Sequence, residues 1–255
     1  TYSQQQVAGL QARLGPAYKV VLGMRYGNPS IIDVVRQLEA EGINRIITLP
    51  MFPQFSSTTT ASIYDAVYTA AAGRRCPFFH ERKRTTPTLR FIEPYYNHPG
   101  FITAMANHLR AVIAKLPAPP DKILISFHGI PNRYIKTGDP YRDHCEQTAE
   151  LLAQALNLPP EGWQIGFQSR FGPEPWLEPY TDEVIEGFAK AGVERPLVFS
   201  PGFTTDCLET LDELGNEGRE QFAHGGGKPD DYTLAACLND NPEFLDYLAE
   251  LVHQN

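Results

Sequence analysis

Short apolar runs alternate with amphipathic stretches along the whole chain of 255 residues. The opening stretch TYSQQQVAGLQARLG has a helical pattern, because Val7, Leu10 and Leu14 fall at spacings of three and four. Further helices are expected near residues 30–41, 60–73, 98–116, 140–156, 178–191, 205–222 and 242–253. Strands are expected at Tyr18–Met24, Arg45–Pro50, Leu89–Pro94, Lys122–Phe127, Gln164–Gln168, Leu197–Ser200 and Tyr232–Leu238. This alternation indicates an α/β fold with right-handed crossovers and parallel strands flanked by helices.

A proline-rich segment, AKLPAPPDK at residues 114–122, separates three strand–helix units from four that follow. Three prolines in so short a piece form a stiff, extended connector. We therefore expect two similar α/β lobes, the first over residues 1–117 and the second over 118–255, with the last helix, 242–253, a candidate to pack back on the first lobe. Because the chain begins inside a helical pattern and without methionine, we also expect the first lobe to lack one strand that precedes residue 1.

Composition narrows the class of partner. The net charge of −8 disfavours nucleic acid and anionic membranes, since both attract basic surfaces. The cysteines lie far apart without a C-x-x-C pair, so reduced thiols in a cytoplasm are the simplest interpretation. No apolar run reaches the roughly 18 residues of a membrane helix, and no signal peptide is recognisable. Neither a G-x-G-x-x-G motif nor a P-loop is present, which disfavours a nucleotide as the ligand.

The first candidate site residue is His128, in the stretch DKILISFHGIP at residues 121–131. The apolar run predicts a buried strand that stops at His128, and Gly129 and Pro131 break the backbone just after it. Ligands of parallel α/β sheets bind at the carboxyl ends of the strands. Taken alone, His128 could equally cap the strand and bond a nearby carbonyl group.

A second candidate is Glu209, in FSPGFTTDCLETLDELGNEGREQF at residues 199–222. Asp206 and Glu209 have the spacing of a helix capping box, which is the structural alternative to a site. Glu213 and Glu217 continue a column of carboxylates at every fourth residue. The column is either a solvated stripe or a path for a divalent cation, since carboxylate oxygens bind such ions.

Two further groups follow predicted strand ends. Trp176 lies between prolines in FQSRFGPEPWLEPYTDE and is either ordinary packing or the wall of a site for a flat ligand. In the first lobe, the Ser/Thr run after residue 55 either caps the next helix or binds a substrate carboxylate. Together these groups suit a large planar acid whose reaction involves protons and a metal. The first-lobe candidates are Arg25, Tyr26, Met51, Phe52, Phe55, Ser56 and Ser57.

Four separated segments resemble the ferrochelatase family, and most closely its proteobacterial form. They are LPMFPQFSSTTTASI, ISFHGIPNRYIKTGDPYRDHCEQT, FQSRFGPEPWLEPYTDE and FSPGFTTDCLETLDEL. The resemblance implies two Rossmann-like lobes of the chelatase fold. It also implies insertion of Fe²⁺ into protoporphyrin IX with release of two protons, which is the last step of haem biosynthesis.

By position, the resemblance implies that His128 and Glu209 are the catalytic pair and bind the metal. Glu213 and Glu217 match an acidic column proposed as a metal or proton route. Aromatic pocket positions match Trp176, Phe203 and Tyr26. The substrate-binding set then comprises Arg25, Tyr26, Met51, Phe52, Ser56, Ser57, Trp176 and Phe203.

The chain departs from the family pattern in three places. Cys207 stands where many members have a second histidine, and no cysteine cluster follows the last helix, so we expect no iron–sulfur cluster and no other cofactor. The strand and lip segment that cover the porphyrin in the family would precede Thr1. We expect a cytoplasmic monomer, with weak peripheral membrane association left open. The alternatives are another tetrapyrrole chelatase and a non-catalytic porphyrin-binding protein.

Overall fold

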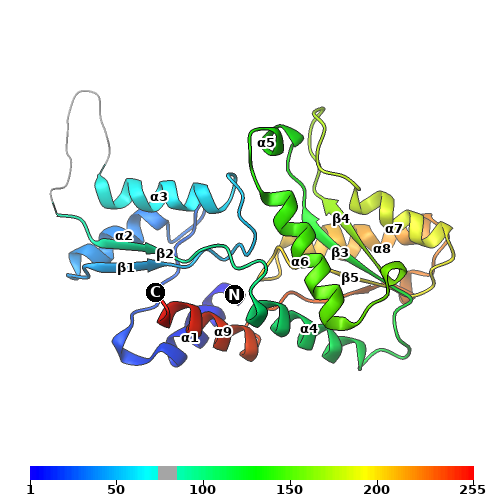
Figure 1. Cartoon of the computed structure of the whole chain (residues 1–255), viewed down its shortest axis with the longest axis horizontal. Helices are drawn as coiled ribbons and strands as arrows, with labels where there is room; N and C mark the ends of the chain where they lie inside the picture. The colour runs from blue at the N-terminus through cyan, green and yellow to red at the C-terminus, as the bar shows by residue number, and fades with distance from the viewer. Residues whose placement is uncertain (74–84) are drawn as a thin grey trace.

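The computed structural model describes residues 1–73 and 85–255 and has one parallel sheet on each side of the proline-rich connector (Figure 1). The first part contains α1 (Tyr2–Leu14), a 3₁₀ turn η1 (Gly15–Ala17), α2 (Ile31–Ala40), β1 (Arg45–Thr48), α3 (Thr60–Ala72), β2 (Thr88–Phe91) and α4 (Pro99–Ile113). The second contains β3 (Lys122–His128), α5 (Asn132–Lys136), α6 (Tyr141–Leu156), η2 (Pro160–Gly162), β4 (Trp163–Gln168), α7 (Thr181–Lys190), β5 (Pro196–Phe199), a π-helix η3 (Glu209–Glu217), α8 (Gly218–His224), η4 (Pro229–Asp231), β6 (Thr233–Leu234) and α9 (Pro242–His253).

Both sheets are parallel, which confirms the predicted α/β class. β1 pairs with β2, and the larger sheet has the order β4-β3-β5-β6. β3 is a central strand of that sheet, and residues 123–127 are completely covered by helices and neighbouring strands. Burial on both faces explains why this strand is apolar in the sequence apart from Ser126, whose buried hydroxyl donates to Gln168 Oε1. The boundary between lobes at residues 117 and 118 stays a prediction.

The last helix, α9, lies beside α1 and α4 (Figure 1). Its inward side chains, including Phe244 and Leu248, belong to the same buried cluster as β3. Gly9 permits the close contact with α1, since a Cβ atom there would lie 2.4 Å from Leu245 Cδ1. Arg13 on α1 also forms an ion pair with Asp246 on α9.

The predicted strand Tyr18–Met24 is wrong for the described residues. Its residues form no ladder, and only Met24 makes an isolated bridge, to Ser30. An apolar run becomes a strand only where a neighbouring backbone pairs with it, and β1 pairs with β2 alone. For a similar reason the strand predicted at Tyr232–Leu238 shrinks to Thr233–Leu234, beside β5.

The helix predicted over 205–222 differs in extent and in type. Residues 209–217 form a π-helix, and the chain continues as the α-helix α8 to His224. Residues 200–207 form turns and irregular backbone ahead of it. The π-helix pairs backbone groups five residues apart and is rare, so a helical pattern alone cannot predict it.

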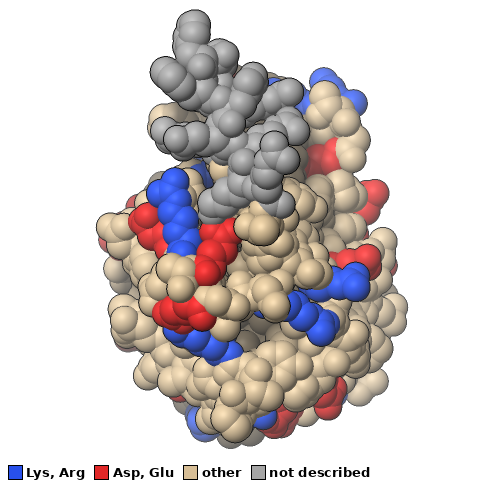
Figure 2. Space-filling view, turned by 90° about the vertical axis from the view of Figure 1, so that its left-hand side faces the viewer, with Lys and Arg blue, Asp and Glu red and all other residues tan. Residues whose placement is uncertain are grey.

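The face at the first-lobe end of the molecule has mixed charge (Figure 2). Outside the grey residues, Lys and Arg atoms are interspersed with Asp and Glu atoms in a larger uncharged area.

Three of the cysteines, Cys145, Cys207 and Cys237, are free thiols, and Cys76 lies outside the described residues. No helix in the described ranges is both long enough and apolar enough to cross a bilayer.

Buried polar contacts join α1 to the chain that precedes the π-helix. Gln6 is only 7% exposed, and its Nε2 donates to the carbonyl oxygens of Thr204 and Asn239 at 3.1 and 2.9 Å. The Thr204 hydroxyl in turn donates to the carbonyl of Met51, in the loop after β1. One glutamine on the first helix therefore fixes the segment that leads to Glu209.

The loop after β1 is also tied to α6. Gln54 donates to the Thr148 hydroxyl at 3.1 Å, and the backbone N–H of Phe55 donates to Nδ1 of His144 at 3.1 Å. The His144 ring stacks on Tyr96, with ring centroids 3.7 Å apart. Partial burial lowers the pKa of His144 below its ordinary value of 6.5, against the smaller opposing effect of the carboxylates at positions 143 and 139.

Replacing Gln6 with leucine should destabilise the protein by about 1–3 kcal/mol, because two buried carbonyl groups lose their donor. Chemical denaturation of the full-length protein measures this loss. Gln5, exposed on the same helix, provides the control, and Gln5→Leu should leave the free energy of unfolding nearly unchanged. Equal effects of the two substitutions would contradict the assigned role of Gln6.

The His144 contact should make stability depend on pH. With the folded pKa below 6.5, the unfolded chain binds the proton first, so the stabilisation is present above pH 6.5 and is lost as the pH falls through the folded pKa. Urea unfolding across this range should show the loss in the unchanged protein. His144→Asn, which keeps an acceptor near the Nδ1 position and does not titrate, should flatten the curve; an identical pH dependence would exclude His144 as the cause.

Candidate active site

His128 is the last residue of β3, and its imidazole is half-buried. Its Nδ1 lies 2.6 Å from the carbonyl oxygen of Gly129. A carbonyl can only accept a hydrogen bond, so in the neutral ring Nδ1 carries the hydrogen and Nε2 keeps its lone pair. A bond from His128 to a nearby carbonyl group was the structural alternative to a catalytic role, and this bond is present. It also fixes the tautomer in which Nε2 can take a proton or bind a metal.

Two aromatic rings lie near this imidazole. The centroid of the His128 ring lies 6.5 Å from that of Trp176 and 6.3 Å from that of Phe203. The indole N–H of Trp176 is buried and has no hydrogen-bond partner among the described residues. Three side chains predicted from separate segments therefore meet at the carboxyl end of β3.

Backbone pairing holds Trp176 in place. Trp176 forms an isolated antiparallel bridge with Pro131, and the N–H of Leu177 donates to the carbonyl of Ile130 at 3.0 Å. Gly129 gives the indole room, because a Cβ atom there would lie 3.3 Å from Trp176 Cε3 and 3.0 Å from the carbonyl oxygen of Gln168. The glycine that follows His128 is thus needed for close approach, in addition to ending the strand.

Glu209 begins the π-helix and is half-buried. Gln168, which is paired with His128 across β3 and β4, directs its Nε2 at the Glu209 carbonyl at 3.4 Å. The predicted capping box is absent, because Asp206 N–H donates to Asn239 Oδ1 and not to the Glu209 carboxylate. Burial, and then the hydrogen bond to Glu209, raise the pKa of Cys207 to about 11, so this thiol is protonated at neutral pH.

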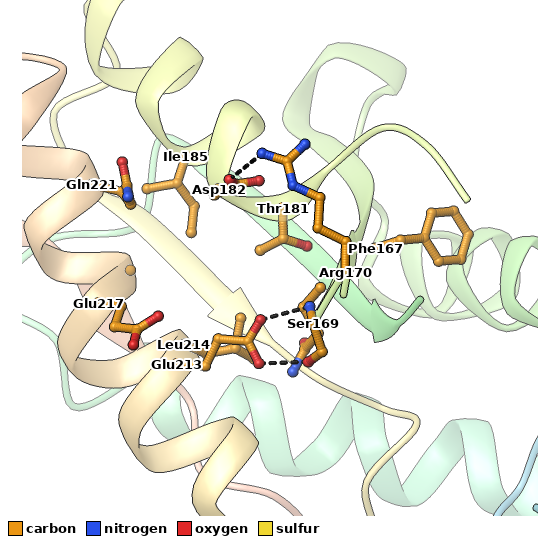
Figure 3. Close-up of a pocket in the computed structure, with 12 residues that line it drawn as sticks. Phe167, Ser169, Arg170, Thr181, Asp182, Ile185, Glu213, Leu214, Glu217 and Gln221 are labelled. Atoms are coloured by element: carbon orange, nitrogen blue, oxygen red, sulfur yellow. Dashed lines mark hydrogen bonds and ion pairs between the residues drawn. The ribbon is translucent and has the colours of Figure 1, made fainter. Parts of the chain in front are cut away.

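Glu213 and Glu217 line a cavity of about 220 Å³ between the end of β4, α7 and the π-helix (Figure 3). The Glu213 carboxylate accepts from the Ser169 backbone N–H at 2.6 Å and from the Ser169 hydroxyl. Arg170, at the same cavity, pairs with Asp182 (Figure 3). Of the two alternatives for the carboxylate column, a solvated stripe fits Glu217, which is exposed. It does not fit Glu213, which is half-buried and whose carboxylate is fixed in place.

The first-lobe candidates make no hydrogen bond or ring contact with His128 in the part of the chain that the structure describes. Arg25 and Tyr26 lie beside the first turn of α3, where Arg25 Nε donates to the Ser62 hydroxyl at 2.7 Å. Tyr26 is 83% exposed, and no contact joins it to His128 in the described structure. Met51 packs against the main core, whereas Phe52 packs against the α2–α3 cluster. Their roles in substrate binding stay predictions.

Ser56 and Ser57 already hold a carboxylate, which belongs to the protein itself. Asp139 Oδ2 accepts from the Ser57 N–H, the Ser57 hydroxyl and the Ser56 hydroxyl at 2.7, 2.6 and 3.1 Å. The Ser/Thr run does not cap α3 through Thr59, whose side chain makes no cap hydrogen bond. Sequence reasoning thus recognised an anion-binding loop but missed its occupant, for which the only local signal is a carboxylate in the turn TGDPY at residues 137–141.

The comparisons with known proteins agree with each other. The family model described as Ferrochelatase matches residues 1–255. The chain is 43% identical to the ferrochelatase of Alcanivorax borkumensis over 100% of its own length and 72% of that relative's. It is 43% identical to the ferrochelatase of a Janthinobacterium strain and 44% identical to that of a Polaromonas strain, and it spans 63% and 65% of those relatives.

Two solved structures share the fold. SirB from Bacillus subtilis with Fe³⁺ has a TM-score of 0.65 at 14% sequence identity, with 99% of this chain and 89% of that chain covered. CbiX, described as the terminal enzyme of sirohaem biosynthesis in denitrifying bacteria, has a TM-score of 0.63 at 14% identity, with 100% and 93% covered. At such low identity the likeness establishes the fold alone. With the family model spanning every residue and close relatives of one name, the chain belongs to the ferrochelatase family.

Proposed function

We propose that this protein is a protoporphyrin ferrochelatase, a lyase that inserts Fe²⁺ into protoporphyrin IX to give protohaem and two protons. The observation that carries the proposal is the imidazole of His128, whose Nδ1 is engaged by the Gly129 carbonyl so that Nε2 can accept a proton, beside the aromatic rings of Trp176 and Phe203. The reaction requires these two features together, because a planar aromatic substrate must lose its pyrrole protons beside a base.

The aromatic residues supply the binding surface for the macrocycle. Trp176 and Phe203 offer large apolar faces to a flat ligand, and rigid backbone pairing holds Trp176 in place. A flat porphyrin exposes its nitrogens poorly, so a site that holds the ring bent favours the transition state for metal insertion over the ground state.

The carboxylates serve the metal and the released protons. Glu209 lies at the start of the π-helix, near the end of β4, and Glu213 and Glu217 continue from it to a cavity. Carboxylate oxygens bind Fe²⁺ and accept protons, so this column is a route for one or both. Fe²⁺ is here a substrate, and the proposal includes no resident cofactor and no iron–sulfur cluster.

The proposal places the protein in the cytoplasm as a monomer, with weak peripheral association with a membrane. The mixed charge of the face in Figure 2 does not suggest a strongly basic surface for anionic lipid or nucleic acid. The alternative functions are insertion of a metal into another tetrapyrrole, such as a sirohaem precursor, and porphyrin binding without catalysis. An insertion assay with protoporphyrin IX and with a sirohaem precursor, each supplied with Fe²⁺ and with Co²⁺, separates the first alternative from the proposal.

Replacing His128 with alanine should lower kcat for anaerobic Fe²⁺ insertion by about 10²–10⁴-fold, because the reaction loses its general base. The change in porphyrin absorption measures turnover in the full-length protein. His224→Ala is the matched control, since this histidine is 75% exposed on α8 and should be dispensable. Porphyrin binding without turnover in the unchanged protein would favour a carrier and contradict the enzymatic proposal.

Replacing Glu213 with glutamine should raise the KM for Fe²⁺ by about tenfold, the equivalent of one lost charge-assisted interaction, with little change in the KM for porphyrin. The amide keeps the shape of the side chain but removes its charge. Steady-state kinetics with each substrate varied in turn measure the two constants. Glu220→Gln, at an exposed position of α8, is the control, and an equal effect there would exclude a specific metal route.

A further inference from the structure

Asp139 is a buried carboxylate, 9% exposed, in the connection between α5 and α6. Its Oδ2 accepts three hydrogen bonds from Ser56 and Ser57, and its Oδ1 accepts the backbone N–H of Tyr141 at 3.0 Å. The serines are 82 and 83 residues away, on the other side of the connector. Among the described residues no lysine or arginine pairs with Asp139, so its burial is compensated by neutral donors, mostly from the first lobe.

The segment that carries Asp139 also holds His128. Tyr141 is buried, and its hydroxyl donates to the carbonyl oxygen of His128 at 2.9 Å. A path of three hydrogen bonds therefore runs from Ser57 through Asp139 and Tyr141 to the backbone carbonyl of the candidate base, His128.

The loop that carries Ser56 and Ser57 makes further hydrogen bonds with the second lobe. Next to Ser56, Phe55 N–H reaches His144, and Gln54 reaches Thr148 on α6. At the beginning of the loop, the Met51 carbonyl accepts from Thr204. Asp139 differs from these partners because it binds three donors of the loop and is itself linked to His128.

We propose that Asp139 is a positioning residue that fixes loop 51–57 of the first lobe relative to His128, and that Ser56 and Ser57 serve this contact and do not bind a substrate carboxylate. This inference rests on the proposed function, because positioning is defined by its effect on porphyrin metallation. The physical basis is that a buried carboxylate satisfied by the opposite lobe disfavours any separation of the loop from the α5–α6 connection.

Asp139→Ala in the full-length protein tests the proposal through chemical rescue. The substitution removes the acceptor of four donors, three from the serines and one from Tyr141, and leaves a site of the size and polarity for formate. We expect kcat/KM for porphyrin to fall by up to about 100-fold, as small displacements of catalytic groups do, and millimolar formate to restore most of it. Asp143→Ala, at an exposed position of α6, should have neither effect.

The double variant Ser56→Ala/Ser57→Ala keeps the experiment decisive if Asp139→Ala folds poorly. A shared positioning role predicts a similar loss for the double variant, no formate rescue, and no further loss when Asp139→Ala is added. Fully additive losses, or a change confined to the KM for porphyrin in the double variant, would instead assign the serines to the substrate. Unchanged kcat/KM in Asp139→Ala would also overturn the proposal.

Hydrogen exchange separates this inference from the proposed function. Peptides covering residues 51–57 and 122–131 should exchange faster in Asp139→Ala and recover with formate, whether or not the protein inserts iron. Absence of iron insertion by the unchanged protein would reject the proposed function, while a formate-reversible change in exchange would still support the contact. No change in exchange at either segment would reject the contact itself.

Discussion

The parallel pairing of β3 with β4 and β5 is the constraint on which the rest of the candidate site depends. Parallel strands bring their carboxyl ends to one edge, and the backbone hydrogen bonds of a buried strand leave it no alternative register. His128 is the last residue of β3 and Gln168 the last of β4, so the sheet itself brings the candidate base next to the residue that reaches Glu209. The apolar interior of β3 thus determines where the polar chemistry occurs.

Polar contacts between the lobes form a second layer of constraint, in addition to the apolar core that α1, α4 and α9 share with β3. Across the boundary between the two lobes, which we call the seam, hydrogen bonds are made by the side chains of Gln6, Thr204, His144 and Asp139. Apolar packing favours close association but tolerates sliding, whereas a buried donor without its acceptor is costly. A seam of this kind suits a site whose walls come from two lobes, since it specifies their relative position.

The local alternatives to function were resolved in different ways. The nearby carbonyl expected for His128 is present, yet it strengthens the chemical interpretation because it fixes the tautomer. The capping box proposed for Glu209 is absent, since Asn239 and not Glu209 satisfies the Asp206 amide. At Ser56 and Ser57 the sequence left open a helix cap or a bound substrate carboxylate, and the structure shows a carboxylate of the protein itself, that of Asp139. A local motif therefore identified the type of interaction more reliably than its partner.

The sequence by itself determined the α/β class, the parallel strand that ends at His128, and the aromatic and acidic segments that follow strand ends. These features depend on periodicity and on short-range backbone breaks, which are readable from one chain. Only the tertiary structure decided that Tyr18–Met24 lacks a strand partner, that residues 209–217 form a π-helix, and that Asp139 occupies the serine loop. Each of these depends on a group distant in the sequence, because pairing, helix type and the satisfaction of a buried charge are set by which backbone and side-chain atoms the fold brings together.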